Sequence, residues 1–137
     1  MPQREPFTSR AVRFQIAKEN RPPTVLEVAV MAVGVRRGAE ALWGLLMWTV
    51  AREKNAGQRP TFEDLMATSL VSRPAAFRQQ ALLREVWCQD DGIAAMADVL
   101  VGARGEAITE LASLPRPTDR ATAMVLVASL PAIGFSL

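Results

Sequence analysis

Apolar residues recur three and four positions apart along most of this 137-residue chain, and β-branched residues rarely alternate with polar ones. Spacings of three and four place apolar side chains on one face of an α-helix, whereas a half-buried strand needs strict alternation. Half of the residues are apolar and 22% are charged, a composition typical of one soluble globular domain. The sequence therefore predicts an all-α protein, a small helical bundle.

The residue types on which most enzymes and metal sites depend are missing or scarce. The chain has no His and no Tyr, and Cys88 is its single cysteine. These absences exclude His-assisted acid–base chemistry, catalytic triads, CxxC redox pairs, an intramolecular disulfide and zinc sites with several Cys and His ligands. We therefore expect a protein that is not an enzyme and that uses no metal and no cofactor. Cys88 is expected to be a small buried apolar residue.

The charged residues are distributed unevenly. Residues 1–84 carry thirteen basic and seven acidic residues, a net charge of +6, whereas residues 85–137 carry three basic and seven acidic residues, a net charge of −4. A basic first part followed by an acidic last part suits a module that binds a polyanion and is followed by an interaction or packing segment. Two ordinary solvated faces would give the same distribution, so charge alone leaves both readings open.

Neither a secretory signal nor a membrane span is expected. The first thirteen residues include Arg4, Arg10 and Arg13 but no continuous apolar stretch of the kind found in a signal peptide. The longest uncharged piece of the apolar stretch that follows is residues 41–51, far short of the roughly 20 residues that a bilayer needs. We expect a cytoplasmic protein without a membrane partner.

Capping and breaking residues divide the chain into three regions. We expect an N-terminal basic arm over residues 1–23, a helical core over residues 24–88 and C-terminal helices over residues 89–137. Thr24 is a typical helix cap, whereas Gly34 and residues 36–38 are expected to break or bend a helix. The helices expected before residue 60 cover residues 9–19, 24–33 and 39–54.

Residues 60–87 contain two short helices separated by a tight turn. Thr61 followed by Asp64 is typical of a capping box, which begins a helix over residues 61–68. Residues 69–71 form the turn. Ser72 then caps a second helix, in which a proline falls in the first turn, where its missing N–H is harmless.

This arrangement resembles the helix-turn-helix of DNA-binding proteins, particularly the tetracycline-repressor-type and homeodomain-like versions, over residues 61–87. Three positions depart from the family pattern: Met66 replaces a small residue, Leu70 replaces the turn glycine, and Gln80 replaces an apolar residue. Leu70 must therefore adopt a left-handed conformation or force a different turn. The matching positions are Thr61, Asp64, Leu65, Val71, Ser72, Arg73, Ala76, Phe77 and Arg78.

The resemblance implies a sequence-specific protein for double-stranded DNA, a transcriptional regulator, that reads the major groove with the helix starting at Ser72. Arg59 and Arg84 flank the unit and can contact the phosphate backbone, as can the arginines of the N-terminal arm. The positions that the resemblance assigns to base and backbone contact are Arg73, Ala75, Phe77, Arg78 and Gln79. The side chains expected to anchor the two helices are Leu65, Val71, Leu82, Leu83, Val86 and Trp87, packed against Trp43, Leu46 and Met47.

The C-terminal region is expected to pack on the core or to form a dimer. Asp90 or Asp91 caps a helix that runs to Leu100, and residues 102–105 form a kink before a helix over residues 106–114. The apolar helix expected over residues 120–130 must be buried, either within the monomer or against a second copy. A homodimer through these helices would suit a palindromic DNA site, and burial within the monomer fits the sequence equally well.

Two other functions remain open. The chain can instead be a non-catalytic protein-interaction module with a structural helix-turn-helix. Its working surface would be the apolar C-terminal helix and the acidic last part of the chain, and its partner would belong to the transcription or replication machinery. A small-molecule sensor would need a pocket lined by Trp43, Met47 and Trp48, although no polar group is expected to converge there. At Phe77, partial burial is a simpler expectation than base contact, and Arg36 and Arg37 are better explained as a solvated helix end than as a phosphate clamp.

Overall fold

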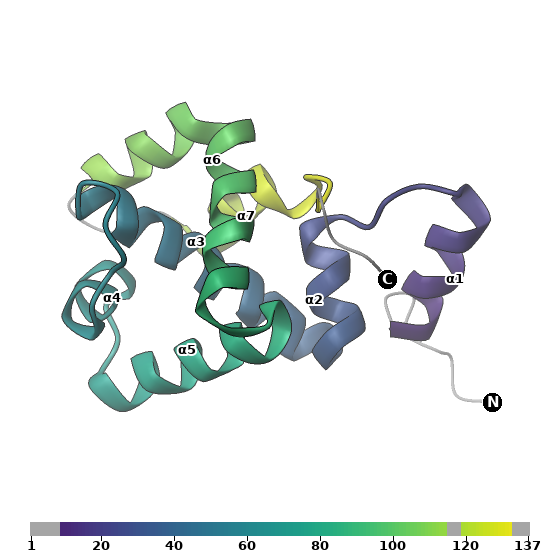
Figure 1. The fold of residues 1–137 in the computed structure, drawn as a ribbon, viewed down its shortest axis with the longest axis horizontal. Coiled ribbons are helices and arrows are strands. Elements are labelled where there is room, and N and C mark those ends of the chain that lie inside the picture. The colour runs from purple at the N-terminus through teal and green to yellow at the C-terminus, as the bar shows by residue number, and fades with distance from the viewer. Residues whose placement is uncertain (1–8, 115–118, 133–137) are drawn as a thin grey trace.

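The computed structural model describes residues 9–114 and 119–132, and within these residues it contains seven α-helices and no strand. The expected all-α class is therefore confirmed. Figure 1 shows the helices gathered around α3, with α1 at one end of the molecule. The helices are α1 (Ser9–Glu19), α2 (Val25–Val33), α3 (Val35–Lys54), α4 (Phe62–Ser69), α5 (Arg73–Trp87), α6 (Gln89–Ser113) and α7 (Arg120–Ala128).

The central helix α3 supplies most of the core. It contacts α2, α4, α5, α6 and α7. Three of its leucines, Leu42, Leu45 and Leu46, have no exposed surface, because apolar residues lie on nearly every side of this helix from residue 41 to residue 51. A helix that is apolar all round is stable only when other elements cover it, and the surrounding helices provide that cover.

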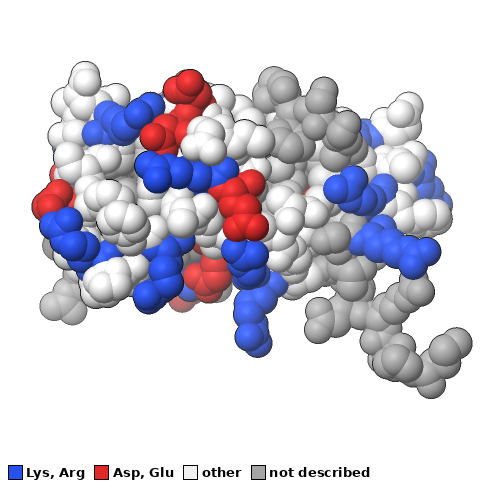
Figure 2. Space-filling model, turned by 60° about the horizontal axis from the view of Figure 1, so that its bottom comes forward, with Lys and Arg blue, Asp and Glu red and all other residues white. Residues whose placement is uncertain are grey.

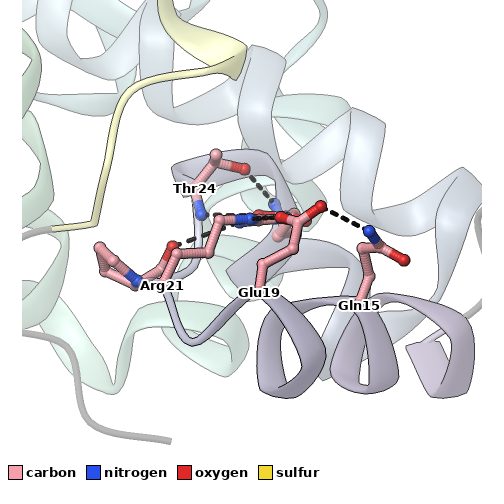
Figure 3. A network of polar contacts seen from close by, with 6 residues as sticks. Gln15, Glu19, Arg21 and Thr24 are labelled. Carbon is pink, nitrogen blue, oxygen red and sulfur yellow. Dashed lines mark hydrogen bonds and ion pairs between the residues drawn. The ribbon is translucent and has the colours of Figure 1, made fainter.

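The N-terminal helix α1 is attached to α2. Val12 and Ile16 are buried, and α1 contacts α2. A network of polar side chains also joins the two helices (Figure 3). Arg21 forms an ion pair with Glu19 and donates two hydrogen bonds, of 2.6 and 2.8 Å, to the buried carboxylate of Glu27.

Glu27 also completes a capping box at the start of α2. The Glu27 amide donates to the Thr24 hydroxyl at 3.1 Å, and the Thr24 amide donates to the Glu27 carboxylate at 2.9 Å. The hydrogen bonds from Arg21 are the main reason why the pKa of Glu27 lies below its ordinary value. The expected cap at Thr24 is confirmed, and so are the limits of the helix in the arm.

Two expected helix starts are wrong. Gly34, with φ of 87°, separates α2 from α3 by itself, so residues 36–38 lie inside α3, which begins four residues before the expected Ala39. Neither Asp90 nor Asp91 caps α6, because the helix already begins at Gln89 and both carboxylates lie in its first turn. There they are favourable near the helix N-terminus without capping it.

The kink expected within residues 102–105 is confirmed. Arg104 has φ of −137° and ψ of 34° inside α6, and its side chain donates a hydrogen bond to the Leu126 carbonyl on α7 at 3.1 Å. Asp119 caps α7, which ends at Ala128 instead of residue 130. The linker residues 115–118, between α6 and α7, lie outside the described residues.

The prediction that the last apolar helix is buried holds for one of its faces only. Ala123 and Val127 of α7 are buried, whereas Val125 is 73% exposed. The prediction that Cys88 is buried is wrong. Cys88 joins α5 to α6 in a left-handed conformation, with φ of 56°, which turns the chain sharply at the surface.

Candidate nucleic-acid interface

The segment from α4 to α5 is shaped by local hydrogen bonds. At the start of α4, the Asp64 amide donates to the Thr61 hydroxyl at 3.2 Å and the Thr61 amide donates to the Asp64 carboxylate at 2.8 Å, so the expected capping box is confirmed. At the start of α5, the Ala75 amide donates to the Ser72 hydroxyl at 3.4 Å. Both helices therefore begin where their capping residues predict.

The turn between these helices is tight and strained at one residue. Leu70 takes the left-handed conformation, with φ of 54° and ψ of 47°, and the Val71 amide donates to the Met66 carbonyl at 3.2 Å. A left-handed conformation costs an L-residue with a side chain roughly 1–2 kcal/mol. Of the two outcomes expected for Leu70, a left-handed conformation or a different turn, the structure shows the left-handed conformation.

The inner face of α5 packs closely on α3. A Cβ atom added at Gly44 would lie 2.9 Å from Gln79 Cγ and 3.2 Å from Leu83 Cδ2, so the absence of a side chain there lets α5 approach α3. Of the side chains expected to anchor α4 and α5, Val71 and Leu82 are half-buried. Trp43 on α3 is half-buried as well. The buried ones are Leu65, Leu83, Val86 and Trp87, together with Leu46 and Met47 of α3.

Gln80 is a buried polar residue on this inner face. It is 8% exposed, and its Nε2 donates to the Asp90 carboxylate at 3.3 Å. Its Oε1 atom has no hydrogen-bond partner, which is costly for a buried acceptor. Asp90 of α6 therefore satisfies the amide nitrogen of this unexpected polar residue, whereas its amide oxygen stays without a partner among the described residues.

The outer face of α5 exposes part of the expected contact set. Arg73, Phe77 and Arg78 are exposed, whereas Ala75 and Gln79 are half-buried at the side of the helix. Phe77 is 57% exposed, more than the expected partial burial. Arg73 and Phe77 contact Glu63 and Phe62 of α4, whereas Arg78 borders the opposite side of α5, beside Ala75 and Gln79.

Most of the expected contact arginines form ion pairs with carboxylates. Arg73 pairs with Glu63 at 2.5 Å, and this ion pair adds to the hydrogen bond from the Glu63 backbone amide in lowering the pKa of Glu63. Arg84 pairs with Asp90 at 2.9 Å, which is the main cause of the lowered pKa of Asp90. Arg59 lies 3.5 Å from the same carboxylate.

Arg78 is different, because no side chain in the described residues forms an ion pair or a hydrogen bond with it. Figure 2 shows that Lys and Arg side chains on the face carrying α5 are interspersed with acidic side chains and form no unbroken basic patch. Arg78 is therefore the arginine of α5 whose charge is most available to an anionic partner. The sequence could not distinguish it from Arg73, because the carboxylate partners come from other elements.

The other expected cations lie away from α5. Arg10 and Arg13 are exposed on α1, and Arg4 lies outside the described residues. Arg36 is exposed, and Arg37 pairs with Glu85 at 2.8 Å, which agrees with a solvated helix end. Phe62, Glu63 and Asp90 were not foreseen as part of this surface. The capping pattern at Thr61 was the one sequence signal near these residues, and it indicated the start of α4 without indicating their contacts.

Of the residues expected to line a sensor pocket, Trp43 and Trp48 border different hollows among the described residues. Met47 and Trp48 are both buried, and Trp48 borders a hollow near Pro60 and Gln80. Trp43 borders a different groove, between α3, α5 and the start of α7.

No protein-family model, curated protein or solved structure matches this chain. In the part of the chain that the structure describes, no group of three His, Cys, Asp or Glu side chains is placed to hold a metal ion. None of the described helices is both long enough and apolar enough to span a membrane.

Proposed function

We propose that α3, α4 and α5 form a helix-turn-helix module that binds double-stranded DNA sequence-specifically, as a transcriptional regulator does, with α5 in the major groove. One observation carries the proposal. The helix α5 is anchored on α3 along its inner face and exposes Arg73, Phe77 and Arg78 within its first two turns on its outer face. The N-terminal part of the second helix is the part that reaches base edges in such modules.

Each of these side chains has a specific use against DNA. The unpaired guanidinium of Arg78 can donate two hydrogen bonds to guanine O6 and N7, and the ring of Phe77 can contact a thymine methyl group. Arg73 is held by Glu63, so a phosphate must compete with that carboxylate for it. Arg59 and Arg84 are likewise held by acidic residues of α6. We therefore assign them a weaker, positioning contact with the backbone.

The proposal includes a homodimer through the C-terminal helices and no catalytic activity. Val125 on α7 is 73% exposed, and Met124, Leu126 and Ala128 of the same helix are half-buried. Two copies related by a twofold axis would present two α5 helices to a palindromic site. Size-exclusion chromatography with light scattering measures the molecular mass of the protein in solution. The mass of a single chain at micromolar concentration would remove the dimer from the proposal.

The test of DNA binding is selection from a random duplex library, followed by fluorescence anisotropy between 50 and 200 mM salt. We expect a selected sequence to bind more tightly than a scrambled one, with affinity that falls as salt rises. Replacing Arg78 by glutamine should weaken binding about tenfold or more and relax the base preference at one position.

Lys18→Gln is the matched control, because it removes one positive charge from the exposed surface of α1. It should change binding by much less than Arg78→Gln. Equal losses in the two variants would mean that Arg78 contributes only general charge. Absence of any selected sequence at low salt would reject the DNA-binding proposal.

A protein-interaction module is the second candidate, and a specific observation favours it. Phe77 and Leu70 are 57% and 64% exposed, and the ring of Phe62 adds to the apolar surface around Phe77. Exposed aromatic rings flanked by arginines are typical of protein contact surfaces. If no duplex is selected, a partner from the transcription or replication machinery whose binding is lost in Phe77→Ala would support this candidate.

A further inference from the structure

The groove beside α5 combines a cationic side chain with an aromatic wall. It has a volume of about 340 Å³ and lies between α3, α5 and the first residue of α7. A volume of this size lies within the range of small-molecule sites. Trp43, Val71 and Leu82 supply apolar walls, and Arg78 and Arg120 reach it from two different helices.

The two arginines differ in how they are held. The guanidinium of Arg120 pairs with Glu40 at 2.7 Å and lies 5.4 Å from the centre of the Trp43 ring. Arg120 is therefore already neutralised and fixed in place by α3. Arg78 has no such partner in the described residues, so the groove carries one uncompensated positive charge. An exposed arginine at the edge of a groove with apolar walls can bind a carboxylate through two parallel hydrogen bonds.

We propose that this groove binds a small monocarboxylate with an apolar body, such as an aromatic acid, whose carboxylate pairs with Arg78. The apolar body lies against Trp43 and Leu82, where burial of its surface is favourable. The groove favours a monoanion, because Glu40 also lines it and leaves a single net positive charge.

The site also suggests how the protein is regulated, and this part of the inference rests on the proposed function. Arg78 is shared between the groove and the outer face of α5 that we assign to DNA. A carboxylate paired with Arg78 withdraws its guanidinium from guanine, so ligand binding and DNA binding oppose each other. By reciprocity, DNA lowers the affinity for the acid by the same factor as the acid lowers the affinity for DNA.

The first experiment uses the full chain without DNA. Benzoate is titrated into the protein and followed by isothermal titration calorimetry and by tryptophan fluorescence. Benzamide, which has the same shape and no charge, is titrated in parallel. We expect benzoate to bind and benzamide to bind at least about tenfold more weakly, because hydrogen bonds to a charged partner are the stronger ones. Equal binding of the two compounds, or no binding of benzoate, would overturn the proposed site.

Two matched variants locate the site. Arg78→Gln should weaken benzoate binding about tenfold or more. Arg73→Gln removes the same kind of side chain from the same helix but outside the groove, and it should leave benzoate binding unchanged. Circular dichroism checks that both variants remain helical. Loss of binding in Arg73→Gln, or retention of binding in Arg78→Gln, would contradict the assignment to Arg78.

A second experiment separates the ligand site from its regulatory role. Saturating benzoate should weaken binding of a selected duplex about tenfold, since it removes the contact of one base-reading arginine. If benzoate binds and the affinity for the duplex stays constant, the coupling is wrong and the site stands. If no duplex is ever selected, the proposed function fails, and calorimetry still decides whether the acid binds.

Discussion

The ring of Phe77 on α5 lies flat against the ring of Phe62 on α4, with centroids 4.6 Å apart and planes inclined by 4°. The two residues are separated by the turn, and their contact fixes the outer face of α5 relative to the start of α4. Arg73 and Glu63 form a second link between the same two helices at 2.5 Å. Two side-chain contacts therefore hold the start of α4 against the part of α5 that we assign to the partner.

Phe77→Ala should reduce partner binding with little effect on stability. Stacked aromatic pairs contribute about 0.5–1.5 kcal/mol, and Phe77 is already 57% exposed. We expect a small loss of melting temperature and a clear loss of affinity for a selected duplex. Phe14→Ala is the control, because Phe14 is 68% exposed on α1, away from the proposed surface. Equal affinities of the two variants would remove Phe77 from the interface.

Leu70→Gly should stabilise the protein. Leu70 holds a left-handed conformation that glycine adopts without strain, and it is 64% exposed, so the lost side chain removes little burial. The relief of roughly 1–2 kcal/mol exceeds the entropic cost of the added glycine, about 0.5–1 kcal/mol. Urea unfolding should show a higher midpoint. Val71→Gly, at the next and half-buried position, should lower it, and a lower midpoint in both variants would mean that Leu70 is not strained.

Gln80→Met should leave stability unchanged or raise it by about 1 kcal/mol. The variant removes a buried acceptor that has no partner, at the cost of one long hydrogen bond to Asp90. Methionine fills a similar volume in the same position. Chemical denaturation measures the change. A loss greater than about 2 kcal/mol would show that the Gln80 hydrogen bond holds α5 to α6.

The ion pair between Arg21 and Glu27 should make stability depend on acid pH. The hydrogen bonds from Arg21 hold the pKa of Glu27 below its ordinary value, so the folded state binds a proton at this carboxylate less readily than the unfolded state. This contribution is fully present above the unfolded pKa of about 4.3, and it is lost as the pH falls through the lower folded pKa.

Glu27→Gln tests this dependence, because glutamine keeps the shape of the capping residue and removes its charge. We expect the variant to be less stable than the natural chain at pH 7, and the difference to shrink below about pH 4.3. The melting temperatures of both proteins, measured from pH 7 to pH 3, give the comparison. A difference that stays constant over this range would mean that the ion pair does not contribute through the titration of Glu27.

Features with a local cause were predictable from the sequence. Thr24, Thr61 and Ser72 each accept a hydrogen bond from an amide three residues later. The starts of α2, α4 and α5 therefore depend on a few neighbouring residues only. Gly34 could be predicted to interrupt a helix, and Leu70 to need either a left-handed conformation or a different turn, for the same reason. The all-α class followed from the spacing of apolar residues, which is also a short-range property.

The availability of each arginine was decided by the tertiary structure alone. Arg73 lies ten residues from its partner Glu63, and Arg120 is eighty residues from Glu40, so the pairs form only when the helices pack together. The same packing leaves Arg78 without a carboxylate partner among the described residues and places it in a groove with Trp43. Apolar periodicity specifies which face of a helix is buried, but it does not specify which helix covers that face or which charged side chains then meet. The sequence by itself therefore determined the helical class and the caps at Thr24, Thr61 and Ser72, because each depends on neighbouring residues. The pairing of the arginines and the groove beside α5 came from the packing of distant elements.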